Sequence, residues 1–193
     1  MKTLLVTFFS FGFYLVSFAQ EKPVYFFGDK IISDPKLATF YGVFGKLSGS
    51  NTYGLNVYDI YNNLVKSGTY IDETLTIPHG KFSYYSFIDI FNDRYGTDFL
   101  IKKTDRFLSE QGKFINGNKN GMWLTFYPDG KVRSIINYKN GFKHGDSKLL
   151  DKDGNTMISG IYKLDVKDSL WNYYQEGRIE TYVNGAFQHK KYN

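Results

Sequence analysis

A phrase of 24 residues recurs through the second half of the chain and constrains the fold more than any other feature. Its aromatic anchors stand at Phe114, Tyr138 and Tyr162, and a fourth, Tyr182, follows after 20 residues. A fixed period of about 20–50 residues is the signature of a repeat architecture, in which each unit buries its apolar surface against its neighbours. The chain is therefore predicted to form an array of units rather than one globular core.

Each copy of the phrase contains two turn signals. The first is Asn-Gly or a substitute, at 116–117, 140–141, 164–165 and 184–185, and the second is Asp-Gly or Glu-Gly, at 129–130, 153–154 and 176–177. Both dipeptides readily adopt the positive φ of tight hairpin turns, and the aromatic and β-branched runs between them are too short for helices. We therefore predict an all-β fold, an elongated and twisted single-layer antiparallel meander of two-strand repeats. Eight glycines are assigned to structural positions of this repeat: Gly80, Gly117, Gly121, Gly130, Gly141, Gly145, Gly154 and Gly185.

The copies divide the chain into regions of different regularity, and about five units can be counted. Residues 112–193 hold the well-kept copies, and residues 51–111 hold two degenerate ones with an insertion at 86–111. Residues 20–50 hold no clean copy and are predicted to cap the first edge of the array, with strands at 24–27 and 40–44 and a turn or short helix start at 34–35. The insertion fits neither period, so an elongated hairpin turning near 92–93 and a short helix from about Thr97 both stay open.

The first 19 residues have the pattern of a secretory signal peptide. Lys2 supplies a positive charge, residues 4–16 are apolar, and Ser17 and Ala19 place small residues before a cut at Gln20. An uncleaved membrane anchor is the alternative, but the apolar stretch is short for a span and no basic cluster follows it. We therefore predict export to the periplasm, the cell surface or the medium, with no transmembrane span after cleavage.

The chain has no cysteine. Disulfides, thiol nucleophiles and cysteine-based metal sites are therefore excluded, and so is the lipid-carrying cysteine of a lipoprotein.

Charge is distributed unevenly along the chain. Residues 20–111 carry 10 basic and 11 acidic residues, net −1, whereas residues 112–193 carry 13 basic and 8 acidic residues, net +5. A mildly basic repeat half would suit an anionic phospholipid surface or an acidic glycan, although solubilising turn lysines are the favoured interpretation. Nucleic acid is not predicted, since the lysines are dispersed and no reading motif is present.

Residues 112–130 resemble the bacterial variant of the MORN repeat (membrane occupation and recognition nexus). That variant reads Gly-x-Tyr-x-Asn-Gly-x-x-x-Gly-x-Trp-x-x-Tyr-x-x-Asp-Gly, and here Phe114 replaces the first Tyr and Tyr127 stands one place late. The resemblance covers residues 112–185 well and 54–85 weakly. It implies a β-repeat scaffold for protein or lipid contacts, with no catalytic residues and no cofactor. An antitoxin-like label on some members also implies an antitoxin or immunity-type partner protein.

Residues able to carry catalysis or hold a metal show no convergent pattern. His79 and His144 occupy equivalent repeat positions, which in adjacent two-strand units lie about 9.6 Å apart. Zinc requires its ligands about 2 Å from one centre, so no metal site is predicted. There is no Gly-x-Ser-x-Gly elbow, and the acidic residues of the repeat half cluster at turns. The chain is predicted not to be an enzyme.

The tryptophan position of the phrase provides the candidate binding residues. Trp123, Ser147 and Trp171 are equivalent in consecutive copies, and Tyr127 and Tyr174 follow the two tryptophans. One interpretation is an aromatic shelf with a notch at Ser147, suited to a sugar or a partner side chain. The other is a packed face in which a large neighbour fills the space above Ser147. The second is favoured because large aromatic residues are usually core.

These features together predict an exported, non-enzymatic β-repeat protein of the cell envelope. A protein-interaction scaffold or binding module with an unknown protein partner is the first hypothesis. A binder of envelope glycan or anionic phospholipid and an antitoxin or immunity-type partner are the alternatives.

Overall fold

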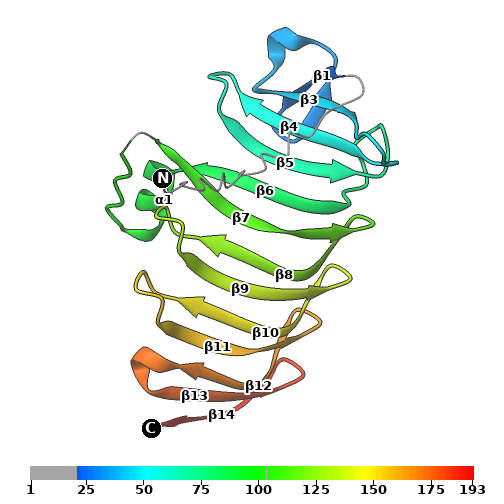
Figure 1. The fold of residues 1–193 in the computed structure, drawn as a ribbon. Helices are drawn as coiled ribbons and strands as arrows, with labels where there is room; N and C mark the ends of the chain where they lie inside the picture. Colours follow the sequence, from blue (N-terminus) through cyan, green and yellow to red (C-terminus); the bar gives the residue numbers. More distant parts are fainter. Residues whose placement is uncertain (1–20, 103) are drawn as a thin grey trace, which may run out of the picture.

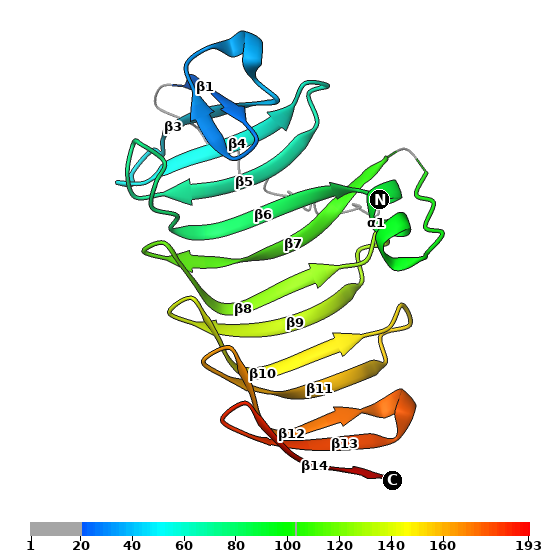
Figure 2. The same ribbon diagram turned by 180° about the vertical axis from the view of Figure 1, so that it is seen from behind.

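The computed structural model describes residues 21–102 and 104–193, so the predicted signal peptide at 1–19 lies outside the described residues. Fourteen strands form one open antiparallel sheet (Figures 1 and 2), which confirms the predicted all-β meander. The strands are β1 (Lys22–Phe27), β2 (Lys30–Ile32), β3 (Phe40–Lys46), β4 (Tyr53–Asp59), β5 (Leu64–Tyr70), β6 (Gly80–Phe87), β7 (Arg106–Ile115), β8 (Asn118–Phe126), β9 (Val132–Lys139), β10 (Phe142–Leu150), β11 (Thr156–Lys163), β12 (Val166–Tyr173), β13 (Arg178–Val183) and β14 (Ala186–Tyr192).

The order of the strands is sequential except at the N-terminal end. Each strand from β3 to β13 pairs with the next, whereas β1 pairs with both β2 and β3 and leaves β2 at the edge. The segment expected to cap the array thus contributes β1 and β3. A single-turn 3-10 helix, η1 (Pro35–Leu37), follows Asp34, whose carboxylate accepts a hydrogen bond from the Lys36 amide at 2.9 Å.

The Asn-Gly turns and their substitute lie along one side of the sheet, on the right in Figure 1. Each turn donates a backbone hydrogen bond to the preceding unit. Asn140 and Gly141 have φ values of 52° and 89°, the double positive φ of a type I′ turn. The Gly141 amide donates to the Lys119 carbonyl at 2.9 Å, and the Gly185 amide donates to the Lys167 carbonyl at 2.9 Å. These hydrogen bonds therefore join each turn to the turn of the neighbouring unit along the sheet. All eight glycines assigned to the repeat have positive φ.

One face of the sheet is closed by aromatic rings that lie over glycines, and we call it the packed face. The indole of Trp123 covers Gly112 and that of Trp171 covers Gly160, so closely that a Cβ atom on either glycine would overlap the ring. Each indole N–H donates to the carbonyl after that glycine, at 3.2 Å to Lys113 and 3.1 Å to Ile161. The glycine of the phrase is therefore a seat for the ring of the neighbouring strand.

The second well-kept copy changes both members of this pair. Ile136 stands where the glycine would be, and its register partner across β9 and β10 is Ser147 in place of tryptophan. A larger residue on one strand is thus matched by a smaller one on the next, as the packed-face interpretation expects.

The insertion forms a helix, α1 (Ile88–Tyr95), beside the ends of β6 and β7 (Figure 1). Phe91 of α1 packs with Phe107 of β7 in a second apolar cluster, separate from the core of the sheet. The Asn92 side chain then fixes the returning loop, because it accepts from the Phe99 amide and donates to the Phe99 carbonyl, both at 2.9 Å. The helix therefore precedes Thr97 instead of beginning there, and the chain makes no hairpin turn at 92–93.

Candidate functional site

The three residues of the predicted aromatic row lie on every second strand of the packed face, β8, β10 and β12, and all are buried. Trp123 is 3% exposed, Trp171 4% and Ser147 9%. Little of either indole is left for a ligand to touch. Their burial favours the packing interpretation over an open aromatic shelf.

The two tyrosines lie elsewhere. Tyr127 packs against Phe91 and Phe99 of the insertion at ring distances of 6.0 and 5.9 Å, and its hydroxyl donates to the Leu150 carbonyl at 2.8 Å. Tyr174 belongs to η2 (Tyr174–Glu176), is 56% exposed, and has its hydroxyl 3.2 Å from Ser159 Oγ. The five residues proposed from the sequence therefore do not form one binding surface.

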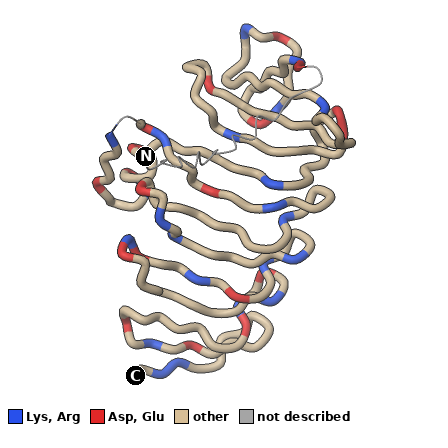
Figure 3. The backbone as a smooth tube through the Cα atoms, in the orientation of Figure 1, with Lys and Arg blue, Asp and Glu red and all other residues tan. Residues whose placement is uncertain are grey.

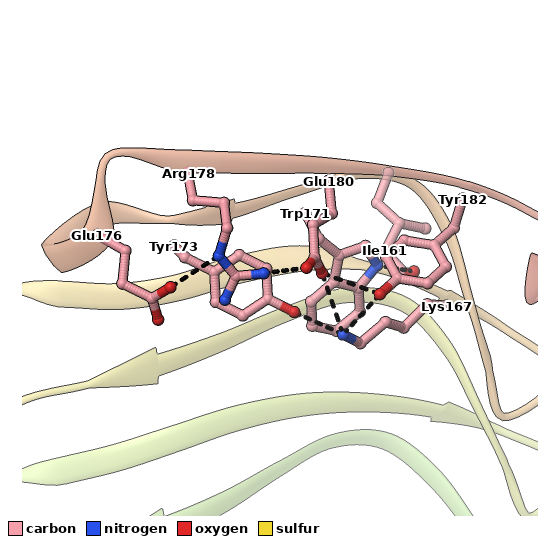
Figure 4. Close-up of polar contacts among 8 residues, drawn as sticks. All are labelled: Ile161, Lys167, Trp171, Tyr173, Glu176, Arg178, Glu180 and Tyr182. Atoms are coloured by element: carbon pink, nitrogen blue, oxygen red, sulfur yellow. Dashed lines mark hydrogen bonds and ion pairs between the residues drawn. The ribbon is translucent and has the colours of Figure 1, made fainter. Parts of the chain in front are cut away.

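A polar network covers Trp171 at the C-terminal end of the packed face (Figure 4). Lys167 Nζ donates to the Tyr173 hydroxyl at 2.6 Å and lies 3.8 Å from a carboxylate oxygen of Glu180, which also pairs with Arg178. The Tyr182 hydroxyl donates to Glu180 at 2.9 Å. Burial alone would raise the pKa of Glu180, but these hydrogen bonds and the two cations hold it below its ordinary value. Glu176 also pairs with Arg178 at 2.7 Å, so the two cations and two carboxylates of the network balance one another.

The turn lysines of the repeat half lie over aromatic rings. Lys119 Nζ is 3.9 Å from the centroid of Trp123, and Lys167 Nζ is 4.7 Å from that of Trp171. The equivalent Lys143 lies 5.0 Å from the ring of Tyr162. Basic residues are dispersed along the sheet (Figure 3), and these three are held by cation–π contacts. Three of the thirteen basic residues in 112–193 are thus held over aromatic rings.

A partly open recess with both polar and apolar walls lies at the other end of the packed face, and we call it the N-terminal cavity. It has a volume of about 550 Å³ and is walled by β1, β3 to β7 and α1. Its lining consists of Phe26, Gly28, Asp29, Phe40, Val57, Asp59, Val65, Lys66, Tyr84, Tyr85, Ser86, Phe87, Ile90 and Arg106. None of these residues was identified from the sequence as a site residue, because they belong to the capping segment and to the degenerate repeats. A signal did exist: Asp59 follows Leu55 and Val57 at alternate positions, where the packed face calls for an apolar residue.

An ion pair between Asp59 and Arg106 forms part of the cavity wall. Both side chains are 10% exposed, and the guanidinium of Arg106 stacks on the ring of Phe87 at 3.6 Å. Asp59 also accepts from the amides of Tyr61 and Asn63, both at 2.9 Å. Burial alone would raise the pKa of Asp59, but the hydrogen bonds and the Arg106 charge hold it below its ordinary value. Asp59 is thus a fixed anion that positions Arg106.

The two cationic side chains of the lining, Arg106 and Lys66, are paired to different degrees. The buried Nε of Arg106 makes no hydrogen bond with a described residue, although its guanidinium pairs with Asp59. Lys66 forms no ion pair with any described residue, and its ammonium lies 5.8 Å from the ring of Phe26. Burial lowers the pKa of Lys66, and the charge of Asp29 only partly opposes that effect. With Asp29 and Asp59 beside Lys66 and Arg106, the lining has two carboxylates and two cations, so its formal charges balance.

Fold and cavity together define an open all-β repeat protein with a partly enclosed, charged recess on one face. The chain matches no family model, and comparisons with curated proteins and with solved structures also give no match. The resemblance to the MORN variant accordingly rests on the repeat residues themselves. Within residues 21–102 and 104–193, no helix is long and apolar enough to cross a membrane, and no cluster of His, Asp and Glu could hold a metal ion.

Proposed function

We propose that this chain is an exported, non-enzymatic repeat protein of the MORN-variant type that acts as a binding module in the cell envelope. Its recognition site is the N-terminal cavity. The observation that carries the proposal is a recess of about 550 Å³ that combines apolar walls with a few buried polar groups. Ligand sites in proteins have this composition and volumes of about 300–1,000 Å³.

The ionisable groups of the cavity favour binding over catalysis. Asp59 is held as a carboxylate and is committed to Arg106 and to backbone amides, so it is poorly suited to accept and release protons. Burial raises the pKa of Tyr84 to about 12, which keeps its hydroxyl protonated as a hydrogen-bond donor. These groups can orient a bound molecule.

The open face of the sheet supports a second candidate, the protein-interaction scaffold. Met122 and Leu170, which neighbour the buried tryptophans in sequence and point to the opposite face, are exposed apolar residues. Contiguous apolar patches mark protein-binding surfaces, and Met122 and Leu170 lie four strands apart, on β8 and β12, so this is the weaker of the two candidates.

One experiment separates the two candidates. The mature chain, residues 20–193, is immobilised and exposed to an envelope extract, and the retained molecules are identified by mass spectrometry. Val65→Trp fills the cavity, and Met122→Trp places the same side chain on the open face. We expect wild type and Met122→Trp to retain a partner that Val65→Trp loses. If Val65→Trp still retains the partner and Met122→Trp loses it, the partner binds the open face of the sheet and not the cavity.

A further inference from the structure

We infer that a groove on the open face of the sheet, opposite the packed face, binds an acidic polysaccharide. Lys81 and Lys113 contact its carboxylates, and polar side chains at the base of the groove contact its hydroxyl groups. This site is additional to the N-terminal cavity and does not depend on it.

Two lysines face each other on neighbouring strands of the open face. Lys81 of β6 and Lys113 of β7 are register partners, next to Phe82 and Gly112, which point to the packed face. Both lysines are exposed, and neither side chain forms an ion pair or a hydrogen bond with a described residue. Like charges directly opposite each other on a sheet are unfavourable. A carboxylate between the two ammonium groups would turn this repulsion into attraction.

The described strands around these lysines supply no acid that could neutralise them. From β3 to β9 the strands contain two acidic residues, Asp59 and Glu110, and both form ion pairs on the packed face. In the loop before β6, Glu73 pairs with Lys22, and Asp72 accepts hydrogen bonds from residues of its own loop. The open face of these strands therefore carries positive charge alone, which favours an anionic partner.

The groove beside Lys81 adds a row of uncharged polar groups. It has a volume of about 270 Å³, and small residues of β4, β5 and β6 form its base. Asn56, Ser67 and Ser83 are successive register partners on the open face, and Gln111 of β7 continues the row. The Gln111 amide donates to Ser83 Oγ at 2.9 Å, whereas the side chains of Asn56 and Ser67 make no hydrogen bond with a described residue. At the usual strand spacing the row is about 14 Å long.

The groove and the lysines together determine the class of ligand. An apolar partner would bury the amide and hydroxyl groups of the row without hydrogen bonds, which costs free energy. Tyr58 follows Asn56 on the same face of β4 and stacks on Tyr41 at a ring distance of 5.4 Å, so an aromatic surface borders the row. A uronic-acid polymer carries hydroxyl groups for the row, C–H faces for the aromatic rings and carboxylates for the lysines.

Trigalacturonate, a trisaccharide with a carboxylate on each sugar, is the probe for this site. Maltotriose is its uncharged counterpart, and acetylated, amidated triglutamate carries the same number of carboxylates without sugar hydroxyls. In isothermal titration calorimetry of residues 20–193, we expect trigalacturonate to bind at least about tenfold more tightly than either, the effect of charge-assisted hydrogen bonds. Its affinity should fall as the salt concentration rises.

Variants test which residues make the contacts. Lys81→Met/Lys113→Met removes the two like charges and keeps the side-chain stems, and it should weaken trigalacturonate binding by at least about tenfold. Asn56→Ala should weaken it by about three- to tenfold without affecting triglutamate. Lys148→Met is the matched control, because Lys148 is an exposed lysine on the open face of β10, and it should bind trigalacturonate as wild type does. Thermal melts check that each variant is folded.

Several outcomes would overturn the inference. Trigalacturonate does not bind, binds no better than maltotriose or triglutamate, or binds the double lysine variant as tightly as wild type. An equal loss in Lys148→Met would show that dispersed charge, and not this groove, attracts the ligand. Binding to vesicles of anionic phospholipid that the double lysine variant loses, without binding of trigalacturonate, would assign the open face to a membrane surface instead.

Discussion

In the second copy, Ile136 and Ser147 replace the glycine and the tryptophan that pack against each other in the other copies. We predict that mutating both residues back to glycine and tryptophan restores that packing. In the first copy Trp123 lies over Gly112, and Phe82 is the register partner of that glycine on the other side. In the same way, Ser147 is the register partner of Gly160, which the ring of Trp171 covers. A large aromatic residue at 147 would therefore lie beside Gly160 as Phe82 lies beside Gly112. Its ring fits over position 136 only if that residue is changed to glycine.

Each single change should destabilise the protein for a different reason. Ile136→Gly removes a half-buried aliphatic side chain and loosens a strand, which costs about 3–5 kcal/mol. Ser147→Trp forces an indole against Ile136, and such overpacking costs about 1–3 kcal/mol. Independent effects would sum to about 4–8 kcal/mol. In the double variant the indole covers the new glycine and its N–H faces the Asn137 carbonyl, so we expect a loss below about 1.5 kcal/mol.

Urea unfolding of the four proteins closes the double-mutant cycle, and the expected coupling is at least about 2.5 kcal/mol in favour of the double variant. Ile135→Gly/Lys148→Trp is the matched control, because these residues are register partners on the same two strands and point to the opposite face. Additive effects at 136 and 147, or equal coupling in the control, would refute the idea that the glycine is a seat for the ring.

Three further outcomes follow from the same structure. Gly112→Ala has an ordinary backbone φ but places a methyl group against the Trp123 ring, so it should lower the free energy of unfolding by about 1–3 kcal/mol; unchanged stability in urea would contradict the stacking. Leu164 has a φ of 51° where other copies carry Asn, so Leu164→Asn should raise the stability by about 1 kcal/mol and Asn140→Leu should lower it by a similar amount in thermal melts. Burial raises the pKa of Tyr70 to about 12, so the folded protein keeps a proton that the unfolded chain loses above pH 10, and stability falls between pH 10 and 12. Tyr70→Phe should flatten that part of the pH profile, and an unchanged slope would show that other groups dominate it.

The fold could be predicted because each repeat encodes it locally. Asn140-Gly141 determines a turn type by itself, and the 24-residue spacing aligns that turn with its neighbours. Even the substitution at Ser147 was informative, since a small residue in a tryptophan position requires a compensating neighbour. Local chemistry and periodicity agree in this half of the chain, which is the condition under which sequence patterns specify structure.

The cavity could not be predicted because nothing periodic connects its parts. Arg106 and Asp59 are 47 residues apart and meet only because α1 and its return loop place β7 beside β6. The helix itself was hidden, since its apolar residues Ile88 and Phe91 continue the strand-like run at the end of β6. The alternation in β4 did place Asp59 on the packed face, but the pattern cannot name a partner that far along the chain.

The degenerate N-terminal half is therefore a better candidate for a ligand-binding site than the regular repeats at 112–193. Copies that seat a ring on a glycine close the packed face, and their lysines and tyrosines are occupied in pairing with one another. In the degenerate half, Lys66 stands two residues before the glycine that seats Phe82, and a helix lies at the edge of the sheet. The result is a recess whose lining residues have no equivalents in the other repeat units. Identical units present the same surface repeatedly, so selectivity for one ligand has to come from the units that differ.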